Sequence, residues 1–372
     1  MSLENLTGTI KNSIPWSSET STTTEVPLNL DAFNQRMFLS DKVVLIFIAI
    51  VATLGNSLVL VVTWLDRSLH LPDKYFVAHL AFADILVGIF VAPLNSYTLQ
   101  IYLSDQTGQI SIHLCRFMEW IDNFALTSSI YTLTFISFDR YFKISKPFQY
   151  KSRMTTSKTL KSIFIILFIS TTIATYGATP HSGSHGILET TAGACPTKAR
   201  EGKEYETFLA VSSFFLPAVI IFLMYTLIFL VAHKRNKMLA NGELGETIND
   251  QNQRTALRRD MKVVRMLLVV VGVFTLCWGP WIMYVFMWHN YEDFIDWDSN
   301  STSYWHQIYL VSFISSTLPL FNSACNPIIY ASLDQKYGEA FKRLFKKIVC
   351  WPSSSTRSPR TPSNELRPQR TR

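Results

Sequence analysis

Residues 115–141 read CRFMEWIDNFALTSSIYTLTFISFDRY, and this stretch decides the fold. No charge lies between Asp122 and Asp139, so one helix can run through lipid or through a protein core. The 18 residues from Asp122 to Arg140 span about 27 Å of helix, close to the hydrocarbon thickness of a bilayer. Because 18 residues make about five turns, Asp122, Ser129 and Arg140 lie on one side of the helix. Charges at this depth predict a ligand, ion or partner contact, or else a structural ion pair.

Further stretches of the chain are also long and nearly free of charge. Hydrophobic residues make up 48% of the sequence and charged residues only 16%, against about 25% in soluble proteins. Each stretch is long enough to cross a bilayer as a helix: residues 43–65, 75–104, 162–179, 207–232, 266–287 and 303–333. The sequence therefore predicts an all-α membrane protein, a bundle of seven transmembrane helices followed by a short amphipathic eighth helix.

Basic residues indicate the orientation of this bundle. Lys and Arg collect after the first, third and fifth spans and in the tail, whereas the loop after the sixth span carries Glu292, Asp293, Asp296 and Asp298 and no base. The positive-inside rule then places the N-terminus outside and the C-terminus inside the plasma membrane. The net charge of +7 is mostly a topology signal, so we expect no nucleic-acid partner.

The segments at the two ends predict modification sites. We expect residues 1–41 to be an extracellular segment without a cleavable signal peptide, 42–333 the membrane domain, 334–350 an amphipathic helix on membrane lipid, and 351–372 a disordered, phosphorylatable cytoplasmic tail. Asn5 and Asn300 fit the N-glycosylation pattern on the outer side. Cys350 follows a basic amphipathic stretch and is a candidate for palmitoylation, the alternative being an unmodified thiol.

Two cysteines fall at the outer ends of the spans. Cys115 opens the third span and Cys195 lies in the outer loop after the fourth, so the two can reach each other in an oxidising compartment. The sequence predicts a disulfide there that ties this loop over the mouth of the helices. Cys277 and Cys325 fall inside spans, and we expect them to be unpaired.

Polar residues at mid-membrane depth form a second candidate site. Asp84 in the second span needs partners, and amide or hydroxyl side chains at similar depth can supply them: Ser129, Asn322, Ser323 and Asn326. This set can hold a monovalent cation such as Na⁺ with Asp84 as the charged ligand, or it can be a hydrogen-bonded packing cluster without an ion. We expect no other metal and no required cofactor.

The sequence lacks the residues and repeats that other functions of a seven-helix protein would require. The histidines within or near the spans do not form a metal-binding set with carboxylates, and no nucleophile elbow or phosphate loop occurs, so we expect no enzyme. A retinal-binding photosensor needs a lysine in the last span, and residues 303–333 contain none. A transporter, the distant alternative, is expected to show internal repeats, and we find none.

Motifs in six of the spans together resemble the rhodopsin-like (class A) G-protein-coupled receptors. The matching residues, in chain order, are Gly55-Asn56, Leu80 with Asp84, Cys115, Asp139-Arg140-Tyr141, Pro217 with Tyr225, Phe274 with Cys277-Trp278-Gly279-Pro280, and Asn326-Pro327-Ile328-Ile329-Tyr330. The resemblance covers about residues 42–347. It implies that an agonist bound outside moves the sixth helix and opens an inner pocket for a heterotrimeric G protein, with arrestin and receptor kinases as further partners.

The resemblance also implies roles for single residues of the switch. Arg140 looks like the G-protein-coupling switch, held in the inactive state by Asp139 and Asp260. Trp278 and Phe274 look like the relay below the ligand. Three more residues complete the implied set: Tyr225 and Tyr330 as the inner partners of the relay, and Phe148 as an apolar plug for the G protein.

Within the family, the third span looks most like that of biogenic-amine receptors, muscarinic and histamine receptors in particular. This resemblance implies that Asp122 contacts a cationic ligand, with Glu119 as a rival acid; the remaining candidate ligand residues are Trp278, Trp281, Ser213 and Ser316. Leu320 departs from the pattern, because a tyrosine usually helps to cap the aspartate from this position. A peptide or another non-amine ligand is therefore the alternative, and Asp122 can instead pair with Arg116 or be protonated and unpaired.

Overall fold

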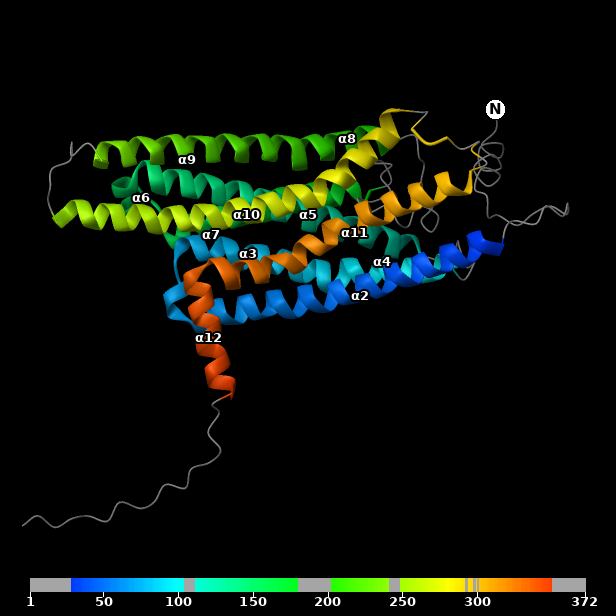
Figure 1. Ribbon diagram of the computed structural model, residues 1–372, viewed down its shortest axis with the longest axis horizontal. Coiled ribbons are helices and arrows are strands. Elements are labelled where there is room, and N and C mark those ends of the chain that lie inside the picture. Colours follow the sequence, from blue (N-terminus) through cyan, green and yellow to red (C-terminus); the bar gives the residue numbers. More distant parts are fainter. Residues whose placement is uncertain are drawn as a thin grey trace, which may run out of the picture.

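The computed structural model describes residues 28–103, 111–179, 202–240, 248–291, 294–296, 299 and 301–349, and its regular structure within these ranges is helical throughout. The long helices run side by side along one axis and form a single bundle (Figure 1). They are α2 (Leu28–Leu65), α3 (Pro72–Leu86), α4 (Ala92–Leu103), α5 (Ile112–Ser145), α7 (Thr156–Gly177), α8 (Gly202–Ala210), α9 (Leu216–Ala240), α10 (Ile248–Asn290) and α11 (Thr302–Leu333). Short elements complete the described chain: η1 (Arg67–Leu69), η2 (Val87–Val91), α6 (Pro147–Arg153), η4 (Val211–Phe215) and α12 (Gln335–Val349).

These elements correspond to the seven predicted spans. The second span is α3 and α4 joined by the π-helical turn η2, and the fifth is α8 and α9 joined by the π-helical turn η4. The first helix begins at Leu28, well ahead of the expected start near residue 42, because hydropathy locates the lipid boundary and not the end of the helix. The predicted fold class, an all-α membrane bundle with a short helix after the last span, is confirmed.

The helix that decided the sequence argument, α5, lies in the interior of the bundle. Six helical segments of the described chain are apolar and long enough to cross a membrane on hydropathy alone, and α5 is the seventh span without being among them. It packs against α3, α7, α9 and α10, and its buried face includes Asn123, Thr127 and Ser128 at 0% exposure. Helices at the periphery instead present exposed side chains such as Phe164 and Phe222, as lipid contact requires. Its polarity follows because protein, not lipid, surrounds α5.

Close approach of α2 and α11 fixes the depth of the polar residues between them. A Cβ atom on Gly55 would lie 2.9 Å from the Pro327 ring, so only glycine allows this contact without a shift. Pro327 also frees the carbonyl of Ser323 from its helical hydrogen bond. The Asn56 amide donates to that carbonyl at 2.9 Å, which satisfies the group inside the bundle.

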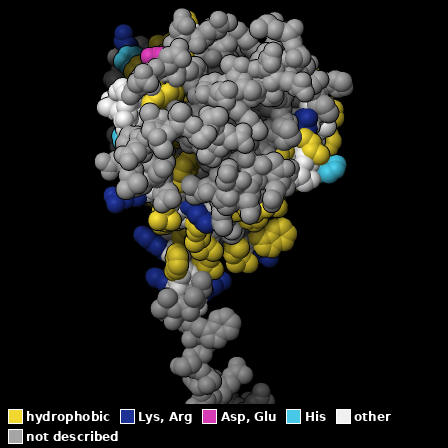
Figure 2. Space-filling model, turned by 90° about the vertical axis from the view of Figure 1, so that its right-hand side faces the viewer, with side chains coloured by type: hydrophobic (Ala, Val, Ile, Leu, Met, Phe, Trp, Pro, Cys, Tyr) yellow, Lys and Arg dark blue, Asp and Glu magenta, His cyan; other side chains and the backbone are white. Residues whose placement is uncertain are grey.

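The last helix, α12, leaves the bundle and runs across its end (Figure 1). Asp334 begins it, accepting hydrogen bonds from the backbone N–H groups of Lys336 at 2.9 Å and Tyr337 at 3.3 Å. Figure 2 views the molecule from the right-hand end of Figure 1, the end away from α12. In this view hydrophobic side chains gather below the bundle, where α12 projects, with Lys and Arg at their edges. The expected amphipathic helix is therefore present.

Candidate functional site

An acid without a partner lies inside the bundle, close to the end where the chain starts. Asp122 is 8% exposed, and it makes no hydrogen bond or ion pair with any residue that the structure describes. It lines a small cavity between η2, α5, α10 and α11 together with Leu126, Trp278 and Leu320. A buried carboxylate is normally paired, so this one is available to a cation or a hydrogen-bond donor from outside the described residues.

Arg116, the candidate protein partner of Asp122, points elsewhere. Its guanidinium donates to the carbonyl of Thr179 at 2.8 Å and lies 3.9 Å from Glu119. The structural ion pair between Arg116 and Asp122 is therefore not formed. Glu119 is itself buried, and its nearness to Arg116 distinguishes it from Asp122.

The other predicted ligand residues do not line this cavity. Trp281 is almost fully buried, with its ring stacked on Tyr284 at 5.8 Å between centroids. Ser213 is fully buried on η4, with its hydroxyl 3.4 Å from that of Ser212. Ser316 donates its hydroxyl to the carbonyl of Phe313. Of the predicted set, the structure thus brings Asp122 and Trp278 together in one cavity.

Asn123, which the sequence argument did not single out, is a second buried polar group without partners. It is fully buried, and neither its amide nitrogen nor its amide oxygen finds a hydrogen-bond partner in the described structure. A Cβ atom on Gly177 would lie 2.7 Å from the amide nitrogen, so α7 approaches α5 closely here. An orphaned amide next to Asp122 marks a place for a water molecule or a polar ligand group. In the sequence, only the presence of an Asn inside a predicted span could have indicated this position.

Three of the predicted sodium residues line this cavity, namely Ser129, Asn322 and Ser323, whereas Asp84 and Asn326 do not. Asn326 donates its amide to Asp84 at 2.7 Å, and the second carboxylate oxygen of Asp84 is buried without a partner. The side-chain oxygens of Asn322 and Asn326 are likewise buried and unpartnered, and Ser129 and Ser323 line the cavity. A hydrogen-bonded cluster that leaves three oxygens unsatisfied has the donor set that a hard cation requires. The residues present therefore fit Na⁺.

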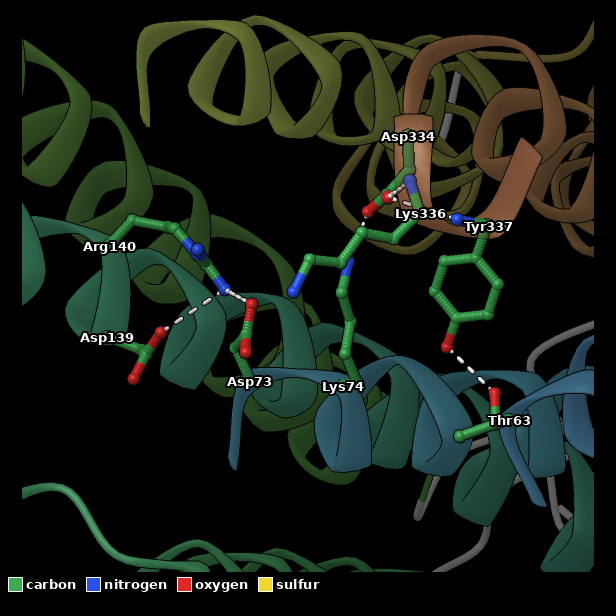
Figure 3. A network of polar contacts seen from close by, with 8 residues as sticks. All are labelled: Thr63, Asp73, Lys74, Asp139, Arg140, Asp334, Lys336 and Tyr337. Atoms are coloured by element: carbon green, nitrogen blue, oxygen red, sulfur yellow. Dashed lines mark hydrogen bonds and ion pairs between the residues drawn. The ribbon is translucent and has the colours of Figure 1, made fainter. Parts of the chain in front are cut away.

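The C-terminal end of α5, which is the predicted inner end, carries the predicted switch, and there the charges are paired (Figure 3). The Arg140 guanidinium lies 2.6 Å from Asp73 and 3.4 Å from Asp139. Asp139 in turn accepts a hydrogen bond from the Tyr150 hydroxyl at 2.9 Å. Burial and the neighbouring Asp139 raise the pKa of Tyr150 well above its usual value, so this hydroxyl keeps its proton. Two acids therefore hold the guanidinium in place, and we call this set of three residues, Asp73, Asp139 and Arg140, the latch.

The nearer acid of this latch differs from the sequence expectation. Asp139 does hold Arg140, but Asp73 at the start of α3 is closer and makes the hydrogen bond. For Asp260 and Phe148 the structure describes the helix and not the side chain, so their predicted roles lie outside the described residues. The sequence does contain a feature that could have indicated Asp73: it is an acid directly after Pro72, at the start of the second span.

Next to this latch, Lys74 fastens α12 to the bundle (Figure 3). Its ammonium pairs with Asp334 and lies 5.0 Å from the centroid of the Tyr337 ring, and both charged side chains are almost fully buried. The Tyr337 hydroxyl shares a 2.8 Å hydrogen bond with Thr63 of α2. Adjacent residues of α3, Asp73 and Lys74, therefore hold the switch arginine and the last helix.

Aromatic side chains connect the outer cavity with the inner end. The rings of Phe274 and Trp278 stack at 6.0 Å between centroids, and Phe214 packs on Phe274 at 6.4 Å. Tyr225 and Tyr330 are buried, and neither hydroxyl has a hydrogen-bond partner in the described part of the chain. Tyr141 of the switch motif packs partly buried against the core. The stacked rings thus extend from the cavity, which Trp278 lines, into the core of the bundle, and their relay role stays a prediction.

Several predicted modification residues lie outside the described residues: Asn5, Asn300, Cys195 and Cys350. Cys115 is disulfide-bonded, and Cys277 and Cys325 are free, as expected. The pairing of Cys115 with Cys195 itself stays a prediction.

Comparison with known proteins now assigns the class. The family model "7 transmembrane receptor (rhodopsin family)" matches residues 55–330. The chain belongs to this family: it is a class A G-protein-coupled receptor, a multi-pass membrane protein and not an enzyme.

Relatives with about the same sequence identity to this chain are receptors named for chemically different ligands. The chain is 29% identical to octopamine receptor beta-2R of Chilo suppressalis over 84% of this chain and 81% of that receptor. It is 27% identical to adenosine receptor A2b of Gallus gallus over 82% of this chain and 88% of that receptor. It is also 27% identical to the neuromedin-K receptor of Homo sapiens, over 80% of this chain and 59% of that receptor. Similarity therefore establishes a receptor that implies a ligand and a G protein, and leaves the ligand type open.

Proposed function

We propose that this receptor binds a small extracellular ligand carrying a protonated amine, and that the ammonium group pairs with Asp122. The observation that carries the proposal is the buried carboxylate of Asp122, which faces a cavity and has no partner among the described residues. Trp278, which lines the same cavity, offers an aromatic surface to the cation. A biogenic amine, with one charge and an apolar body, matches an acid set among Leu126, Leu320 and Val91.

The stacked aromatic side chains provide a route from this ligand to the G protein. A ligand that shifts Trp278 also shifts Phe274, since the two rings stack in one helix, α10. Movement of α10 then opens the inner end, where Arg140 leaves Asp73 and Asp139 and meets a heterotrimeric G protein. In this proposal the N-terminus is extracellular, the receptor lies in the plasma membrane, and arrestin and receptor kinases act on the cytoplasmic side.

Sodium acts as an allosteric ion in the same proposal. Asp84 would hold it with Ser129, Asn322, Ser323 and Asn326, whose buried oxygens fit a hard cation. A bound ion would supply a positive charge that stabilises the Asp84 carboxylate. Asp122 lines the same cavity as Ser129, Asn322 and Ser323, so the proposed ligand and ion sites adjoin.

A non-amine ligand, a peptide in particular, is the second candidate, and Leu320 favours it. Leu320 lines the cavity where the amine-receptor pattern places a tyrosine hydroxyl, so Asp122 lacks that hydrogen bond. The orphaned amide of Asn123 likewise suits a ligand that offers a donor and an acceptor.

A second-messenger screen in cells tests the proposal. Each protonated amine is compared with its neutral, shape-matched analogue, and a panel of peptides is run beside them. We expect activation by at least one amine and a large loss of potency with its neutral analogue. Activation by peptides or neutral ligands alone would contradict the amine and leave the receptor class unchanged.

A further inference from the structure

A groove lies where the inner end of α2, the turn η1 and α12 meet. Its volume is about 330 Å³, within the range of small-molecule sites. Val62, Leu65 and Leu344 form an apolar floor, and Arg67, Arg343 and Lys347 form a basic rim. Neither the ligand cavity nor the switch uses any of these residues.

The groove lies at the inner boundary of the membrane. The first membrane-crossing segment ends at Leu65, and Trp64 and Leu65 are 82% and 62% exposed, as expected of side chains in contact with lipid. Phe345 of α12 is also exposed, and the hydrophobic side chains around α12 face the outer end of the bundle, where the bilayer lies (Figure 2). The apolar floor is therefore continuous with the lipid, whereas the rim lies at headgroup depth.

The charge of the groove is positive after its internal pairing. Asp66 accepts a hydrogen bond from the N–H of Ser68 at 3.0 Å and pairs with Arg343 at 2.8 Å. These contacts lower the pKa of Asp66 despite its partial burial, so it stays ionised and occupies Arg343. Arg67 and Lys347 have no ion pair among the residues described. Two positive charges thus remain above an apolar floor.

We propose that this groove binds an anionic phospholipid of the inner leaflet, with its phosphate headgroup between Arg67 and Lys347 and an acyl chain against Val62, Leu65 and Leu344. One molecule with a charged head and an apolar chain satisfies both halves of the groove, whereas a soluble anion satisfies the rim alone. Its occupancy braces α12 against η1, beside the contacts of Lys74. The inference rests on the inside orientation given under the proposed function and is independent of the agonist.

Native mass spectrometry of the purified full-length receptor tests the site, with phosphatidylserine as the probe and phosphatidylcholine as the neutral reference. Each basic side chain at the surface contributes roughly fivefold in affinity. The double variant Arg67→Gln/Lys347→Gln should therefore lose about twentyfold in phosphatidylserine binding. The matched control Lys158→Gln/Lys161→Gln removes the same charge from exposed positions at the inner end of α7 and should bind as the wild type does. Equal losses in both variants would overturn the site.

A charge-gain variant separates lipid binding from a structural role. Asp66→Asn frees Arg343 for the phosphate, so phosphatidylserine binding should rise about fivefold although a native ion pair is lost. A fall in binding would contradict the proposal. Glycerophosphoserine, the soluble headgroup, should compete poorly because it has no chain for the floor. Displacement at the same concentration as the lipid would make the groove a site for a free phosphate and overturn the lipid assignment.

Discussion

The two halves of the bundle treat buried charge in opposite ways. At the inner end, Arg140 lies between Asp73 and Asp139, and Lys74 pairs with Asp334. In the outer half, Asp122 is equally well enclosed and has no partner in the described chain. Paired charge stabilises one arrangement of helices, whereas unpaired charge costs stability and waits for a ligand. The difference separates a region held together by its own ion pairs from a region whose carboxylate is available to a ligand.

The largest effect expected is on stability at the inner end. Lys74→Met should lower the free energy of unfolding by about 3–5 kcal/mol, since it leaves the buried Asp334 carboxylate without its cation. Thermal unfolding of the purified receptor measures this loss. The double variant Lys74→Met/Asp334→Asn removes both charges and keeps a helix cap, so it should regain most of the stability. No regain would indicate that contact with Tyr337, and not charge pairing, holds α12.

The matching substitution in the outer half should act on ligand binding instead. Asp122→Asn should weaken a cationic agonist by about a hundredfold or more, because the ammonium loses its buried counter-charge. Its unfolding temperature without ligand should not fall, since Asp122 has no partner to lose among the residues that the structure describes. Binding and second-messenger assays measure the potency.

Glu119→Gln is the matched control for Asp122→Asn. It removes an acid one turn away on the same helix and should change agonist affinity only a few-fold. Loss in Glu119→Gln with survival in Asp122→Asn would move the cation site to Glu119. Survival in both variants would end the amine proposal.

Weakening the latch without removing its arginine should raise basal signalling. Asp73→Asn takes away the nearer acid of Arg140, and a coupling of roughly 1 kcal/mol shifts a two-state equilibrium about fivefold. Asp260→Ala, which removes the acid implied by the family resemblance, should act in the same direction. Basal second messenger at equal surface expression measures both variants, and the exposed Glu339→Gln serves as control. Unchanged basal signalling in Asp73→Asn would indicate that Asp139, and not Asp73, restrains Arg140.

The smallest effect expected concerns the cluster between the two halves. If Asp84 and its neighbours hold sodium in the closed state, then sodium should lower agonist affinity about fivefold, the lower end of allosteric coupling. Potassium at the same ionic strength should do less, and Asp84→Asn should abolish the difference. Radioligand binding in membranes measures it. Equal effects of both salts would mean screening of surface charge and no ion site.

Sequence alone determined the architecture and the position of Asp122, the acid proposed to bind the ligand. Length, hydropathy and basic loops are local properties of the chain, so the seven spans were predicted before any contact was known. Helical periodicity placed Asp122 and Arg140 on one face of α5, and the motifs placed Trp278 and Phe274 between cavity and switch. The charged residues of α5 were predicted to contact a ligand, an ion or a partner; in the structure Asp122 lines the cavity and Arg140 lies in the latch.

Tertiary structure alone decided which charges are paired. Asp73 holds Arg140 because α3 packs against α5, bringing together residues 67 positions apart. Arg116 leaves Asp122 alone because the carbonyl of Thr179 at the end of α7 lies within its reach. No local pattern encodes these choices, since a partner is selected by packing and geometry among helices that are distant in sequence. The sequence thus determined that acids and bases lie within the membrane, and the packing decided which of them remain available to a ligand.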